Sequence, residues 1–171
     1  DISLFQHVDT GENRRDFFTN LPVRRNVDAV FVTSFGVEPE EIQQLQRIHV
    51  PIIGINTPSS EGFDATISID DEKGMYTATQ HLINLGHRHI VYPCSEAAGL
   101  DSSIDARARG FIRACEDAEG RHDINWQVLS VPRGPAFADS ALSALLALDK
   151  FPDAICCQMD MMAIPLVLKL E

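Results

Sequence analysis

The chain has 171 residues, of which 44% are hydrophobic, so it is long enough for one ordinary domain or two small lobes with a buried core. Its formal net charge of −11, from 25 acidic and 14 basic residues, argues against direct binding of this chain to nucleic acid, because phosphate binding needs clustered Lys and Arg. No apolar run approaches the length of a membrane span, and we expect no membrane partner.

Seven short β-rich runs alternate with helical stretches along the chain. The predicted strands are residues 2–8, 29–33, 52–55, 66–69, 89–92, 128–131 and 154–157. Most lack polar alternation, and the runs 29–32 and 52–55 in particular indicate strands buried on both faces of a parallel sheet between helices. We therefore predict an α/β fold with doubly wound parallel sheets.

The helical stretches between these strands have recognisable ends. Thr10 can cap a first helix, Pro39 suits the first turn of a second, and Asp70 or Asp71 can cap a third, which stops at Gly86. The predicted helices span residues 12–18, 39–48, about 71–85, 106–118 and 138–148, and a last helix begins at Met161.

One strand breaks the alternation. The run 66–69 follows the strand 52–55 without an intervening helix, after a loop rich in Pro, Ser and Gly. We place a lobe boundary directly after it, which predicts an N-terminal lobe over residues 1–70 and a C-terminal lobe over 71–171.

Polar side chains gather where the predicted strands end, and in open α/β sheets ligands bind beyond the carboxyl ends of the strands. Hydroxyl, amide, carboxylate, guanidinium and aromatic groups there suit a neutral polyhydroxy ligand, since planar polar groups pair with hydroxyls and a ring covers the apolar face of a sugar. The candidates from these strand ends are Ser34, Phe35, Asn56, Asp101, Arg133 and Asp160.

Six stretches in this order resemble the effector-binding core of the lactose/galactose repressor family (LacI/GalR) of bacterial transcription regulators, whose fold is that of periplasmic sugar-binding proteins. They are residues 27–30, 50–53, 68–71, 81–90, 107–111 and 152–163. The resemblance implies that Arg107 and Asp160 grip a small effector, expected to be a sugar, from the second lobe, while Ser34, Phe35 and Asn56 close from the first. It further implies a homodimer, a hinge between the lobes, and operator DNA bound by a helix-turn-helix headpiece upstream.

The chain departs from the family pattern at both ends and at single positions. It begins at what resembles the second strand of the first lobe and ends inside a helix, so we expect a partial chain that lacks the headpiece, the first strand and the last crossover elements. Pro165 falls within a predicted helix, which its missing N–H would disturb. Asn56 replaces a common aspartate and Met159 a common asparagine, so the pattern leaves the effector's identity open.

Simpler interpretations exist for several of these residues. Arg107 could be an ordinary surface cation, and Asp160 could serve only as the N-cap of a helix beginning at Met161. The three histidines at positions 81, 87 and 89 lack acids at ligand spacing, so we expect no metal, and we expect no cofactor. The four cysteines have no framework spacing and are expected to be reduced thiols of a cytoplasmic protein.

Two other classes of function compete with a ligand-sensing regulator. A secreted sugar-binding protein of a transport system would carry an export signal upstream and would fit poorly with four unpaired cysteines. An α/β enzyme would need a phosphate-binding glycine loop, a nucleophile elbow or a paired-acid site, and the sequence contains none of these. We therefore expect a binding protein that is not an enzyme.

Overall fold

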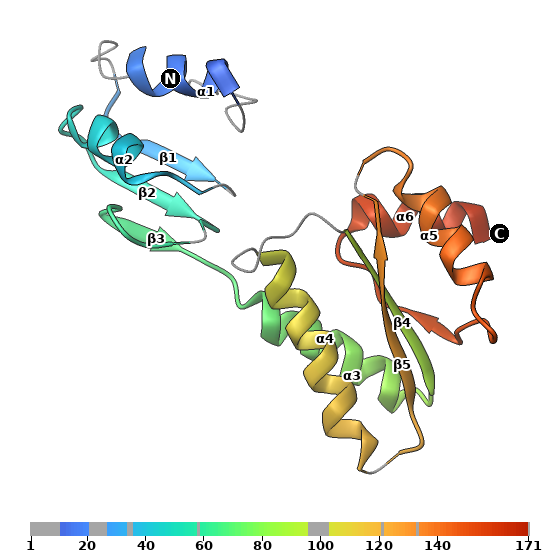
Figure 1. Ribbon diagram of the computed structural model, residues 1–171. Helices are drawn as coiled ribbons and strands as arrows, with labels where there is room; N and C mark the ends of the chain where they lie inside the picture. The colour runs from blue at the N-terminus through green and yellow to red at the C-terminus, as the bar shows by residue number, and fades with distance from the viewer. Residues whose placement is uncertain are drawn as a thin grey trace. The chain divides into compact units, whose positions relative to one another are not determined.

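The structure is a computed structural model that describes residues 11–20, 27–33, 36–57, 59–95, 103–120, 122–132 and 134–170, with side chains for all of these except 11–13, 95 and 103–105. The chain divides into two compact units, Asp1–Ile69 and Asp70–Glu171, which are described separately (Figure 1). None of the helices in the described ranges has both the length and the apolar character that crossing a membrane requires.

Unit 1 contains a three-stranded parallel sheet with strand order β1-β2-β3. Its elements are α1 (Gly11–Asn20), β1 (Val30–Thr33), α2 (Pro39–Gln46), β2 (Ile52–Ile55) and β3 (Ala65–Ile67). Helix α2 begins as the sequence predicts, with Pro39 in its first turn and a capping box formed by Glu38 and Glu41. Strand β3 pairs directly with β2 and is reached without a helix, as expected.

The core of unit 1 lies on one face of its sheet. Phe18 of α1 and Leu45 of α2 pack there with Val32 and Ile52. On the opposite face, Phe31 is 61% exposed, so the prediction that the run 29–32 is buried on both faces is wrong. In the described part of unit 1, both helices pack against the same face, and the apolar composition of the strand does not reveal this.

Unit 2 is a second three-stranded parallel sheet, with β4 in the centre of the order β5-β4-β6. Figure 1 shows α3 and α4 side by side on one face of this sheet and α5 and α6 on the other. Its elements are α3 (Asp71–Asn84), β4 (His89–Ser95), α4 (Ser103–Glu119), β5 (Asn125–Val131), α5 (Phe137–Leu146), β6 (Ala154–Ile155) and α6 (Asp160–Leu170).

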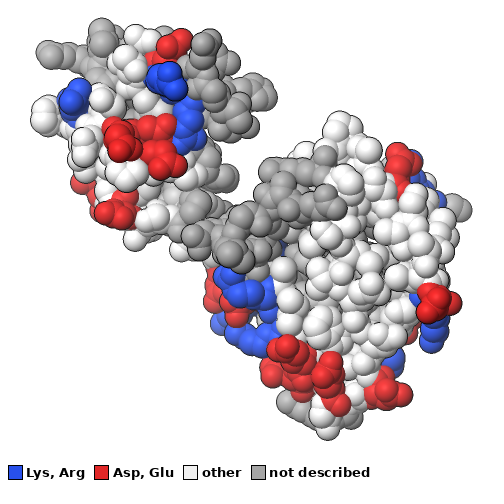
Figure 2. All heavy atoms as spheres, in the orientation of Figure 1, with Lys and Arg blue, Asp and Glu red and all other residues white. Residues whose placement is uncertain are grey.

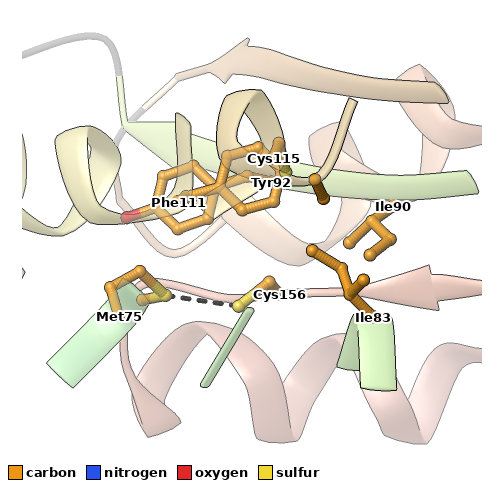
Figure 3. Packing of buried hydrophobic residues seen from close by; sticks show 8 residues of the cluster. Met75, Ile83, Ile90, Tyr92, Phe111, Cys115 and Cys156 are labelled. Atoms are coloured by element: carbon orange, nitrogen blue, oxygen red, sulfur yellow. Dashed lines mark hydrogen bonds between the residues drawn. The ribbon is translucent and has the colours of Figure 1, made fainter. Parts of the chain in front are cut away.

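Both faces of β4 are buried. Tyr92 points into a cluster formed with α3 and α4, where its ring stacks on Phe111 with 5.0 Å between ring centroids (Figure 3). Val91 points into the other cluster, which includes Leu145 of α5 and Leu166 of α6. Neither Tyr92 nor Val91 is exposed, so unit 2 confirms the doubly wound α/β fold that the sequence predicts.

The ends of α3 and the path of α4 depend on particular residues. The Asp70 carboxylate accepts a hydrogen bond from the Lys73 nitrogen at 2.9 Å and caps α3, while Gly86, with φ of +100°, allows the chain to leave it. A Cβ atom at Gly110 would meet the carbonyl oxygen of Glu72 and the nitrogen of Tyr76. The glycine therefore lets α4 approach the backbone of α3.

Other boundaries differ from the prediction. Strand β5 begins three residues earlier than expected, at Asn125, because as an edge strand it alternates exposed and buried residues and its polar start does not resemble a buried strand. Strand β6 ends at Ile155 rather than at Cys157, and α2 ends at Gln46. The strand predicted over residues 2–8 and the predicted cap Thr10 lie outside the described residues.

Candidate functional site

Arg107 is the most strongly held of the described candidate side chains. Its Nε atom donates to Asp71 Oδ1 at 2.8 Å, and one terminal nitrogen, Nη1, donates to the backbone carbonyl of Gln158 at 2.9 Å. The side chain is 25% exposed and that of Asp71 is 11% exposed. Arg107 therefore joins three elements, namely the start of α3, the first turns of α4 and the loop between β6 and α6. Its Nη2 atom has no partner among the described residues.

Asp160 is the first residue of α6 and is exposed. The first turn of the helix closes on the Met159 carbonyl, which accepts hydrogen bonds from the nitrogens of Met162 and Ala163 at 3.0 Å. The helix thus begins at Asp160 itself, one residue earlier than if Asp160 were its N-cap. Within the described ranges, the Asp160 carboxylate makes no hydrogen bond. Because Gln158 binds Arg107 and lies two residues before Asp160, the two candidates flank the same short loop.

A cavity of about 250 Å³ lies beside α6, and most of its lining is apolar. Arg107 does not line it. Its walls are formed by Ile155, Cys157, Gln158, Met159, Asp160, Ala163, Leu166, Val167 and Leu170.

Asn56 has a clear local role at the end of β2. Its φ of +51° lies in the left-handed region that asparagine tolerates. Its backbone nitrogen donates to the Ile67 carbonyl at 2.8 Å, and its side-chain oxygen accepts from the Ile69 nitrogen at 3.2 Å. Asn56 therefore fixes the chain where it leaves β3, at the last residue of unit 1.

Ser34, Phe35, Asp101 and Arg133 lie outside the described residues. The described candidates are thus Arg107 and Asp160 in unit 2 and Asn56 in unit 1.

Sequence reasoning missed a buried polar pair next to Arg107. The side chain of Gln158 is part of a residue only 3% exposed, and Tyr92 is fully buried. The Tyr92 hydroxyl and both amide atoms of Gln158 have no hydrogen-bond partner in the described part of the chain. Burial raises the pKa of the Tyr92 hydroxyl, and the facing Gln158 side chain acts to lower it. A glutamine directly after the apolar run 154–157 was the available sequence signal.

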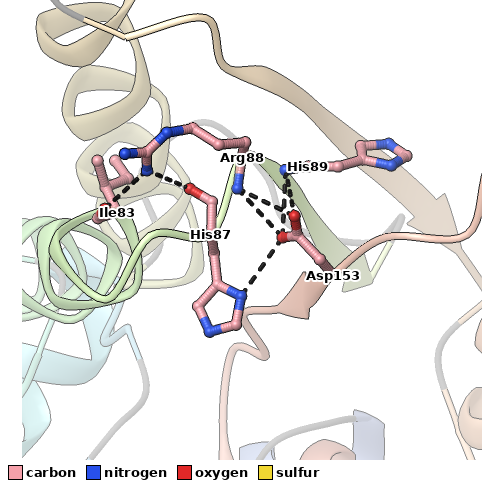
Figure 4. A network of polar contacts seen from close by, with 5 residues as sticks. All are labelled: Ile83, His87, Arg88, His89 and Asp153. Carbon is pink, nitrogen blue, oxygen red and sulfur yellow. Dashed lines mark hydrogen bonds and ion pairs between the residues drawn. The ribbon is translucent and has the colours of Figure 1, made fainter.

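Asp153 lies directly before β6 and connects the beginning of this strand to the beginning of β4 (Figure 4). Its two carboxylate oxygens accept hydrogen bonds from the backbone nitrogens of Arg88 and His89 at 3.1–3.2 Å, and one of them pairs with His87 Nδ1 at 3.5 Å. Burial alone would raise the pKa of this carboxyl, but the hydrogen bonds from the Arg88 and His89 nitrogens and the nearby histidines outweigh burial and hold the pKa below its ordinary value. No local pattern in the sequence indicates this role.

Charges of both signs are interspersed on the face of the molecule shown in Figure 2, where Lys and Arg lie beside Asp and Glu. Arg14 pairs with Glu41, and Arg109 and Arg113 both pair with Glu72, at 3.2 and 2.7 Å. Arg14 is thus neutralised locally, while Arg109 and Arg113 share the one negative charge of Glu72. Among the described residues, no group of three or more His, Cys, Asp and Glu side chains could hold a metal ion, and the four cysteines form no disulfide.

The model of the periplasmic binding protein-like domain family matches residues 79–171, which is more than half of the chain. The chain belongs to this family. A transcriptional repressor named PurR from Vibrio cholerae is 27% identical over 165 residues, covering 94% of this chain and 47% of the repressor.

Similarity to solved structures shows which type of periplasmic binding protein-like domain the chain is. A LacI family transcriptional regulator from Enterococcus faecium with bound ribose is 27% identical, with a TM-score of 0.72, over 91% of this chain and 56% of that one. A Cra transcriptional dual regulator from Pseudomonas putida in complex with fructose 1-phosphate shares the fold, with a TM-score of 0.68. It is 21% identical over 94% of this chain and 58% of that one. The chain is therefore an effector-binding domain of the LacI/GalR type, and it spans about half the length of these relatives.

Proposed function

We propose that this domain senses a small neutral polyhydroxy effector, a sugar, for a transcription regulator. In this proposal the effector binds between the two units, Arg107 and Asp160 bind its hydroxyls from unit 2, and Asn56 with Ser34 and Phe35 contacts it from unit 1. Asp101 and Arg133 are proposed as further contacts. No covalent bond is made or broken, so the domain acts as a binding protein and not as an enzyme.

The observation that carries the proposal is the way Arg107 is held. Two of its nitrogen atoms are fixed by Asp71 and by the Gln158 carbonyl, and Nη2 is left without a described partner. A guanidinium oriented in this way can donate to a ligand without losing much side-chain freedom on binding. Asp71 already offsets much of its charge, which favours an uncharged ligand over an anion.

Regulation follows if the effector binds one arrangement of the two units better than another. Differential affinity shifts the population of arrangements, and the shift would reposition DNA-binding headpieces on an operator. We propose that these headpieces lie outside this sequence, that the regulator is a homodimer, and that it works in the cytoplasm. The alternative of a secreted transport protein is not favoured, because the compared relatives are transcription regulators.

A ligand screen tests the proposal. The full chain is screened by thermal shift against monosaccharides, disaccharides, sugar phosphates and purines, with ribose as a reference because a relative contains it. We expect a saturable rise of the unfolding midpoint with at least one neutral sugar, and abolition of that rise in Arg107→Ala. Saturable binding only of charged or purine ligands would contradict the sugar assignment, and binding that survives in Arg107→Ala would contradict the site.

A further inference from the structure

Gln158 contacts Arg107 through its backbone, while its side chain turns into the core. The carbonyl accepts the Arg107 hydrogen bond at 2.9 Å, and the residue is 3% exposed. Two residues earlier in the chain, Cys156 packs in the same cluster as Tyr92, Met75 and Ile83 (Figure 3). The buried side chain and the carbonyl that binds Arg107 thus belong to the same residue.

A glutamine is an expensive side chain for this place. Its two amide atoms and the Tyr92 hydroxyl are buried, and none has a hydrogen-bond partner in the described ranges. Removing such groups from bulk water costs free energy, and a methionine or leucine of similar size would pack with the neighbouring apolar side chains without that cost. A polar pair at this position is best explained by a role in the adjacent site.

We propose that Gln158, supported by Tyr92, is a positioning residue for Arg107. The glutamine amide and the tyrosine hydroxyl face one another across the core and, with a small hydrogen-bonding group such as a buried water, fix the loop between β6 and α6. The fixed loop presents its carbonyl to Arg107 Nη1 and complements Asp71, which holds Nε on the other side. Only the consequence for effector binding rests on the proposed function.

The first test needs no effector. Gln158→Met and Tyr92→Phe remove the polar atoms while nearly conserving shape, and Gln127→Met, at an exposed position of β5, is the matched control. Hydrogen exchange of the Arg107 Nε–H group is followed by NMR on the full chain, alongside the unfolding midpoint. We expect about tenfold faster exchange in Gln158→Met and a smaller increase in Tyr92→Phe, with no fall in the midpoint and no change in the control.

A merely structural role predicts a different pattern. Exchange that stays at the wild-type rate in both variants, or that accelerates only in step with a loss of global stability, would overturn the inference. If Gln158→Met does not fold, Tyr92→Phe decides alone, because it removes one oxygen atom and leaves the rings stacked.

The second test measures binding of the sugar that the thermal-shift screen identifies. We expect about tenfold weaker binding in Gln158→Met and unchanged binding in Gln127→Met. Wild-type affinity in Gln158→Met would refute the positioning role and leave the sugar-sensing proposal standing. Faster Arg107 exchange in a protein that binds no sugar would refute the sugar-sensing proposal and leave the positioning role standing.

Discussion

Replacement of Gly110 by alanine tests the close contact between α3 and α4 that places Arg107 beside Asp71. The new Cβ would lie 2.9 Å from the Tyr76 nitrogen and closer still to the Glu72 carbonyl oxygen, well inside the roughly 3.5 Å of a relaxed contact. Both obstacles are backbone atoms, so the helices must separate, at a cost near the upper end of the ~1–3 kcal/mol range for overpacking. The higher helix propensity of alanine returns about 0.5–1 kcal/mol.

The net expectation for Gly110→Ala is a loss of about 2 kcal/mol of unfolding free energy, or roughly 4–8 °C in the unfolding midpoint for a protein of this size. Gly74→Ala is the matched control, because this glycine lies inside α3 with nothing within 4 Å of its hypothetical Cβ. It should gain about 0.5–1 kcal/mol from helix propensity alone. Chemical and thermal denaturation measure both values, and equal effects of the two substitutions would refute the packing argument.

Two further predictions follow from groups with shifted pKa values. Asp153→Asn should lower the free energy of unfolding by about 1 kcal/mol at pH 7, because the carboxylate accepts the hydrogen bonds of the Arg88 and His89 nitrogens. This value is reduced for solvent screening, since the aspartate side chain is 47% exposed. The folded-state pKa of Asp153 is lowered, so its contribution is complete above about pH 4 and declines as the pH falls from there through the folded-state value. Urea denaturation at pH 7 and pH 3 checks this, and a difference between the two proteins that is as large at pH 3 as at pH 7 would contradict it. Burial raises the pKa of the Cys115 thiol to about 12, so iodoacetamide at pH 8 should leave this cysteine unmodified in the folded protein and modify it in urea. Alkylation of Cys115 at the same rate in both states would show that it is not buried.

The order of the elements could be predicted from the sequence because each depends on local patterns. The Gly86 stop, the first turn at Pro39 and a cap at Asp70 or Asp71 follow from backbone chemistry within a few residues, and the structure confirms the first two and selects Asp70 as the cap. The burial of unit 1 could not be predicted in this way. An apolar strand such as the one containing Phe31 looks the same whether helices cover one face of its sheet or both.

The candidate site likewise has one part that could be predicted from the sequence and another that could not. The position of Arg107 came from its resemblance to a family motif, but its partners Asp71 and Gln158 lie 36 and 51 residues away and no local pattern connects them. The connection made by Asp153 was missed for the same reason, since it reaches 65 residues back to Arg88. Contacts of this kind depend on how the sheet and helices pack.

Calorimetric titration tests the central claim, that Arg107 and Asp160 bind a neutral effector, most directly. The full chain is titrated with the sugar from the screen, and Arg107→Ala and Asp160→Ala are compared with Arg109→Ala, whose arginine lies on the same helix and pairs with Glu72 at the surface. We expect affinity to fall at least tenfold in the first two variants and to stay at the wild-type value in the third. Wild-type affinity in both Arg107→Ala and Asp160→Ala, in proteins that remain folded, would contradict the proposed site.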